Sequence, residues 1–170
     1  MNDRHRLISE IADRMAIHDL IVKYARGRDT TDPVLYREIF AGDATIGPPG
    51  KAFSRNLDEI LAKVANDIIR FNPGKKPETT SYAVMRHQVS NILITLSGDS
   101  ARSEYYVDTL AYNAAQKRPE ILGTARNEDE YRRVDGRWWI TRSTLNFGWS
   151  NEEMGRELKV GPYTPPEYRS

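Results

Sequence analysis

The strongest constraint in this sequence is a change of hydrophobic period about halfway along the chain. Up to residue 71, apolar residues recur every three or four positions, which is the spacing of amphipathic helices. From residue 87 onwards there are four β-rich runs, at 87–96, 101–112, 121–134 and 137–147, each bounded by a turn signal. Helices followed by strands predict an α+β domain in which three N-terminal helices pack on a curved, mainly antiparallel β-sheet.

The segment 8–24 predicts a long helix that is apolar on two sides. One stripe has helical spacing and consists of Ile17, Leu20, Ile21 and Tyr24, and a second lies roughly opposite, at Ile8, Ile11, Met15 and Val22. Either the helix is sandwiched inside its own domain, or one stripe contacts another subunit. Gly27 is expected to end the helix, which would place Asp29 in the following connection.

Shorter elements follow. A second helix is expected after Asp32 and Pro33, which supply an N-cap and a first-turn proline. A short strand at 44–46, a loop at 47–50 and a third amphipathic helix at 56–71 complete the first half. In the second half, the turn signals Gly98-Asp99 and Asp135-Gly136 separate consecutive runs, so these strands should form an antiparallel meander.

Length and composition limit the classes of function. The 170 residues suit a single domain, expected at 1–150, followed by an extended, proline-bearing arm at 151–170. The absence of cysteine excludes a disulfide framework, a thiol nucleophile and thiolate-held metal. A net charge of +1 gives no broad field for nucleic acid or an anionic membrane, so neither is expected as a partner. No signal peptide or transmembrane run is visible, which makes a cytoplasmic location the default expectation.

Histidine chemistry remains as a candidate. The sequence motifs of dinucleotide binding, P-loops, zinc proteases and GxSxG hydrolases are all missing. Of His5, His18 and His87, only His87 opens a predicted strand. Histidine titrates near neutral pH and suits acid-base catalysis beside a carboxylate, although a lone histidine in a strand is often structural. The three histidines are too far apart to suggest a metal site, and no cofactor is implied.

Four segments carry a family resemblance. They read AIHDLIVKYARGRDTTD at 16–32, IFAGDATI at 39–46, RHQVSNILITLSGDSARSEYYVD at 86–108 and YRRVDGRWWITRSTLNFGW at 131–149. Taken together, in order and spacing, they resemble the SnoaL-like family of the nuclear transport factor 2-like superfamily. The resemblance spans about 11–149 and implies the cystatin-like cone fold, an α+β cone whose helices and curved sheet enclose an apolar pocket.

The resemblance also implies a set of catalytic residues. Dehydratases and dehydrochlorinases of this family pair an Asp after the first helix with a His at the start of a strand, and these match Asp29 and His87. One dehydratase of similar sequence has a Tyr five residues before the Asp, which matches Tyr24. Its further polar groups on later strands would correspond to Asp108 and Arg142.

Each candidate also has a structural alternative. Tyr24 lies on the apolar stripe and is equally well explained as a core tyrosine with a tethered hydroxyl. Asp29 can cap the following turn through its side chain. Asp108 and Arg142 can form a structural ion pair across neighbouring strands.

The residues and the resemblance lead to one main hypothesis. If Asp29 contacts His87 in a pocket, it fixes the imidazole tautomer and stabilises the imidazolium, so His87 can take a proton from carbon and return it. Arg142 would bind a developing oxyanion, and Tyr24 would donate a hydrogen bond. The prediction is a cofactor-independent lyase or isomerase, dehydratase- or cyclase-like, that acts on a small apolar cyclic substrate.

Two further expectations accompany this hypothesis. The alternative function is a non-catalytic ligand-binding or assembly domain of the same fold, because one fold supports many functions. The two-sided first helix and the resemblance together predict a homo-oligomer, either a dimer or a trimer.

Overall fold

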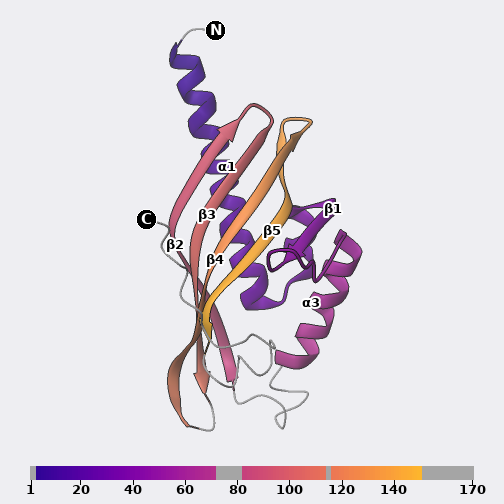
Figure 1. The fold of residues 1–170 in the computed structure, drawn as a ribbon, viewed down its shortest axis with the longest axis vertical. Helices are drawn as coiled ribbons and strands as arrows, with labels where there is room; N and C mark the ends of the chain where they lie inside the picture. Colours follow the sequence, from indigo (N-terminus) through magenta and orange to yellow (C-terminus); the bar gives the residue numbers. More distant parts are fainter. Residues whose placement is uncertain (1–2, 72–81, 114–115, 151–170) are drawn as a thin grey trace.

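The computed structural model describes residues 3–71, 82–113 and 116–150, and all structural statements refer to these (Figure 1). It has the α+β fold that the sequence predicts, with helices first and strands second. The elements in chain order are α1 (Asp3–Thr30), α2 (Pro33–Ile39), β1 (Phe40–Gly47), α3 (Leu57–Phe71), β2 (Tyr82–Ser97), β3 (Ser100–Asn113), β4 (Arg118–Val134) and β5 (Arg137–Ser150).

The five strands form one mixed, mostly antiparallel sheet in the order β1-β5-β4-β3-β2. Strands β2 to β5 make the predicted antiparallel meander, and β1 adds to β5 in parallel. At the β4–β5 turn, Asp135 and Gly136 both have positive φ angles, of 50° and 76°, as a two-residue type I′ hairpin requires. The long strands curve strongly along their length (Figure 1).

Helix α1 packs on one face of this sheet, called the inner face below, where it contacts β2 and β5 (Figure 1). Its buried stripe is the first one that the sequence predicts: Ile17, Leu20, Ile21 and Tyr24. A polar contact also fixes the helix, because both carboxylate oxygens of Asp13 accept from Arg133 Nη1 at 2.8 and 2.9 Å. The same Asp13 accepts from Trp138 Nε1 at 2.8 Å.

The expectation that Gly27 ends the first helix is wrong. Helix α1 continues to Thr30, so Asp29 lies in its last turn rather than in the connection. The structure gives Gly27 a different role, since a Cβ at this position would lie 2.8 Å from Cε2 of Tyr36 on α2. This glycine permits the close approach of two helices.

The second stripe of α1 is exposed, as Ile8, Ile11 and Met15 are 55%, 57% and 64% accessible. The helix is therefore not sandwiched inside its own domain. The expected arm at 151–170 lies outside the described residues, and no helix of the described part is long and apolar enough to cross a membrane.

Candidate active site

Asp29 and His87, which are far apart in the sequence, meet between the end of α1 and the first half of β2. Nδ1 of His87 lies 2.8 Å from Oδ1 of Asp29, and the backbone N–H of His87 donates to the same oxygen at 2.8 Å. The side chain of His87 is 1% accessible and that of Asp29 is 14% accessible. The pairing expected for these two residues is thus present, and Asp29 accepts from His87 on β2 rather than capping the turn that follows α1.

This pairing determines the tautomer of the histidine. A carboxylate only accepts hydrogen bonds, so Nδ1 of His87 carries the proton and Nε2 carries the lone pair. Nε2 is buried and has no hydrogen-bond partner. An unpaired buried acceptor is costly, and such atoms in native proteins need an explanation. A proton-accepting role at Nε2 is one such explanation.

The environment keeps His87 neutral. Its pKa is lowered from 6.5 to about 4, mainly by burial and also by the positive charge of Arg28, which together outweigh the raising effect of Asp29. At neutral pH the imidazole is therefore neutral, with a proton on Nδ1 only, and Nε2 can act as a base.

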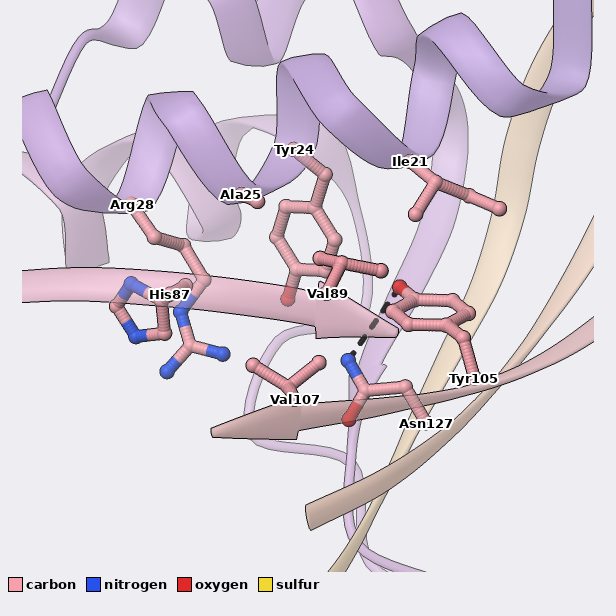
Figure 2. A pocket seen from close by; sticks show the side chains of 9 residues that line it. All are labelled: Ile21, Tyr24, Ala25, Arg28, His87, Val89, Tyr105, Val107 and Asn127. Atoms are coloured by element: carbon pink, nitrogen blue, oxygen red, sulfur yellow. Dashed lines mark hydrogen bonds between the residues drawn. The ribbon is translucent and has the colours of Figure 1, made fainter. Parts of the chain in front are cut away.

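His87 lines a cavity between α1 and strands β2, β3 and β4. The cavity is lined by Ile21, Tyr24, Ala25, Arg28, His87, Val89, Tyr105, Val107 and Asn127 (Figure 2). Four of these are aliphatic and five are polar or charged, which suits a small organic ligand held by a few oriented groups. The free volume is about 10 Å³, roughly the space of one water molecule. A ring-sized ligand therefore requires lining side chains to move.

Tyr24 has features of both roles expected for it, as a core residue and as a residue of the site. Its ring packs edge-on against Tyr36 and Phe40, with centroids 5.8 and 5.2 Å apart, so it is part of the core. It also lines the cavity, with its hydroxyl directed inward between His87 and Tyr105 (Figure 2). Burial raises the pKa of this phenol, which therefore stays protonated and able to donate.

A buried carboxylate behind the cavity wall was not anticipated from the sequence. Oδ2 of Asp129 on β4 accepts from the hydroxyls of Tyr105 at 2.7 Å and Tyr131 at 3.2 Å. Burial raises the pKa of Asp129 to about 6, although the hydroxyls of Ser143, Tyr105 and Tyr131 lower it in part. The Ser143 hydroxyl is close enough to Asp129 to affect its pKa, but it forms no regular hydrogen bond among the described residues.

This group links Asp129 to the cavity through Tyr105. Tyr105 lines the cavity, and its hydroxyl donates a hydrogen bond to Asp129. Asn127 Nδ2 donates a hydrogen bond to the Tyr105 oxygen at 3.4 Å (Figure 2). The sequence signal is the alternation of Asn127, Asp129 and Tyr131 along β4, which puts three polar side chains on one face. Arg28 carries a comparable signal, because it follows Tyr24 by four residues and so shares its helix face.

The structure does not bring Asp108 and Arg142 to the cavity. On β3 the inner face is formed by odd-numbered residues such as Tyr105 and Val107, so Asp108 points to the other side. On β5, Thr141 is an extra residue opposite the Glu130–Tyr131 step. This β-bulge reverses the alternation. As a result Ser143 is buried and Arg142 is exposed.

The alternative role of Asp108 and Arg142 is not supported either. They lie on β3 and β5, which are separated by β4, and no ion pair joins them among the described residues. Groups of three or more His, Cys, Asp or Glu side chains suited to a metal ion are likewise missing from the described part of the chain.

The fold belongs to a known class. The layout of helices on a curved, mostly antiparallel sheet is the cystatin-like fold that NTF2-like proteins also have. Within it, the SnoaL-like domain matches residues 9–144, so the chain belongs to the SnoaL-like family. Among curated proteins none matches this sequence.

Solved structures share the fold at low sequence identity. A protein from Novosphingobium aromaticivorans, proposed to be a scytalone dehydratase, is 17% identical with a TM-score of 0.69, and 96% of this chain matches 99% of that one. A hexachlorocyclohexane dehydrochlorinase from Novosphingobium barchaimii is 20% identical with a TM-score of 0.68, over 94% and 99%. A protein of unknown function from Nostoc punctiforme is 20% identical with a TM-score of 0.63, over 80% and 91%. The fold is thus shared with dehydratases, dehydrochlorinases and proteins without an assigned function.

Proposed function

We propose that this protein is a cofactor-independent lyase or isomerase that moves a proton on a small, largely apolar cyclic substrate. One observation carries the proposal. His87 lines a cavity and has its Nδ1 held by Asp29, while its Nε2 is buried and has no hydrogen-bond partner. This is the arrangement that a general base requires.

The residues can be given roles in one reaction sequence. Nε2 of His87 takes a proton from a substrate carbon next to a carbonyl group, and the C–H electron pair becomes part of an enolate. Asp29 stabilises the resulting imidazolium, because its carboxylate already accepts the Nδ1 proton. Tyr24 donates a hydrogen bond to the oxygen on which negative charge develops.

The proton on Nε2 can then leave in either of two ways. In a dehydration, the enolate expels a β-hydroxyl group that receives the proton from Nε2, so water leaves and a double bond remains. In an isomerisation, Nε2 returns the proton to a different carbon and the double bond moves. Both leave His87 neutral, as its lowered pKa favours.

The experiment is a ligand screen followed by kinetics. Thermal shift over cyclic carbonyl and hydroxyl compounds identifies binders, since a bound ligand stabilises the native state. Turnover of each binder is then compared among wild type, His87→Ala and the control His18→Ala. His18 is a suitable control because its side chain is 52% accessible on α1.

The expected loss in His87→Ala is about 10² to 10⁴-fold with the fold retained by circular dichroism. His18→Ala should match wild type. Unchanged turnover in folded His87→Ala would reject the mechanism. Binders that are never converted would instead support the non-catalytic ligand-binding alternative.

A further inference from the structure

Arg28 brings a cation into the cavity beside the proposed base. It lies in the last turn of α1, next in sequence to Asp29, and it is one of the lining residues. Its side chain runs back over the cavity, and its guanidinium lies beside the imidazole of His87 (Figure 2). Helix α1 thus supplies two charged groups to the site. Asp29 holds His87 in place, and Arg28 lines the cavity.

The guanidinium of Arg28 has no anionic partner in the described part of the chain. By contrast, Arg133 pairs with Asp13 and Asp99 at 2.8 Å, and Arg14 pairs with Glu10 at 2.9 Å. The Cζ atom of Arg28 lies 6.0 Å from the centroid of the Tyr24 ring. Within the described residues, therefore, no carboxylate engages the five N–H donors of this half-buried guanidinium.

Neighbouring carboxylates do not satisfy this charge. Oδ1 of Asp29 is occupied by two donors from His87. Asp129 is enclosed behind Tyr105, which stands between it and the cavity. The positive charge of Arg28 also helps to lower the pKa of His87, which shows that the two groups act on each other electrostatically.

A simpler role for Arg28 is the one that a cation plays near a helix C-terminus, where it offsets the negative end of the helix dipole. Arg26 lies in the same stretch of helix and can serve that purpose from an exposed position. The dipole alone does not account for a guanidinium that is turned into a cavity lined by a buried base.

We propose that Arg28 recognises a carboxylate on the substrate, so that this pocket selects acidic ring compounds over their neutral analogues. A guanidinium presents a planar fork that binds a carboxylate through two parallel hydrogen bonds. A carboxylate held there would lie beside His87, because the two residues line the same cavity. The proposal rests on the function given above and names its substrate class.

The test measures binding and needs no turnover. The probes are two matched pairs: benzoate with benzamide, and cyclohexanecarboxylate with its methyl ester. Affinities are measured by calorimetry for wild type, Arg28→Gln, Arg28→Lys and Arg26→Gln. Arg26→Gln is the matched control because it removes the same charge from an exposed site two residues earlier on α1.

In wild type, each carboxylate should bind at least about tenfold more tightly than its neutral partner, as expected for a charge-assisted bidentate pair. Arg28→Gln should remove this preference, Arg28→Lys should keep part of it, and Arg26→Gln should leave it unchanged. A merely structural role would weaken both members of a pair alike.

Three results would each overturn the proposal. Wild type could bind the acid and its neutral analogue equally, the preference for the acid could survive in Arg28→Gln, or no carboxylate could bind up to roughly 10 mM. Failure of this proposal can be distinguished from failure of the proposed function. Carboxylate selection through Arg28 with full turnover in His87→Ala would reject the base mechanism alone, and the reverse pattern would reject the acidic substrate alone.

Discussion

One oxygen of Asp29 accepts two hydrogen bonds from His87, since Oδ1 lies 2.8 Å from both the backbone N and the ring Nδ1. An asparagine can reproduce this with its single carbonyl oxygen, so Asp29→Asn should keep the fold and the tautomer. It cannot offset the imidazolium charge, and turnover should fall about 10²-fold or more. Comparing kcat with the melting temperature checks both statements.

Asp29→Ala is the informative companion to that variant. It leaves the buried N–H of His87 without an acceptor, which should cost about 1 to 3 kcal/mol of unfolding free energy. Asp29→Asn as unstable as Asp29→Ala would show that the shared oxygen is not what holds the two elements together.

The pH dependence of catalysis should reflect the lowered pKa of His87. A base with a pKa of about 4 is unprotonated throughout the neutral range, so kcat/KM should stay flat and decline only near pH 4. Because the Arg28 charge contributes to this lowering, Arg28→Gln should move the decline to higher pH. Histidine chemical shifts measured against pH provide the same pKa without a substrate, and a midpoint near 6.5 in wild type would contradict this account.

Asp129 should make the protein less stable as the pH rises through the range from about 4 to 6. Its folded-state pKa of about 6 exceeds the ordinary 3.8, so in this range the folded protein binds a proton that the unfolded chain releases. Asp129→Asn should therefore match wild type near pH 4 and exceed it at pH 7 by up to about 3 kcal/mol. Urea unfolding at a series of pH values measures this.

The comparison with wild type at each pH isolates Asp129, because His87 titrates in both proteins. Asp135→Asn in the exposed β4–β5 turn is a control that keeps the turn chemistry. Stability curves of wild type and Asp129→Asn that run parallel from pH 4 to 7 would argue against a strained, buried carboxylate.

Replacing Gly27 should destabilise the protein although alanine is the better helix former. Alanine gains about 1 kcal/mol in helix propensity, but its Cβ would lie 2.8 Å from the buried ring of Tyr36. That ring is stacked on Phe40 at 5.6 Å and cannot easily move, so a net loss of about 1 to 2 kcal/mol is expected. Gly42→Ala, with open space around its Cβ, should be close to neutral by the same denaturation assay.

The exposed stripe of α1 leads to the prediction of a homo-oligomer. Ile8, Ile11 and Met15 form a continuous apolar surface on a helix that projects past the end of the sheet (Figure 1). Two copies of this chain can bury the same stripe against each other around a two-fold axis. Light scattering at micromolar concentration should give a mass above 19.5 kDa, and Ile11→Glu should reduce it. A mass of one chain for wild type would remove the prediction.

Periodicity was sufficient to predict the order of helices and strands, because apolar spacing reports directly which face of each element is buried. The pairing of Asp29 with His87 came from resemblance, and no local pattern joins residues 58 positions apart. Asp129 was missed although its alternation with Asn127 and Tyr131 was visible, since polar residues on an inner face contradict the usual pattern of a buried core. The position of Arg142 was beyond prediction, because it depends on a β-bulge that no residue type announces.

That bulge at Thr141 has a consequence for how such a pocket can diversify. Before it, even-numbered residues of β5 such as Trp138 and Ile140 are inward, and after it Ser143 and Leu145 are. Deleting Thr141 would restore plain alternation and leave Ser143 and Leu145 inward, whereas keeping Thr141 and flattening the bulge would turn Arg142 and Thr144 inward in their place. Substitutions that remove the bulge without losing a residue would thus exchange the interior groups along this half of β5, giving a lineage of this fold a short route from one reaction to another.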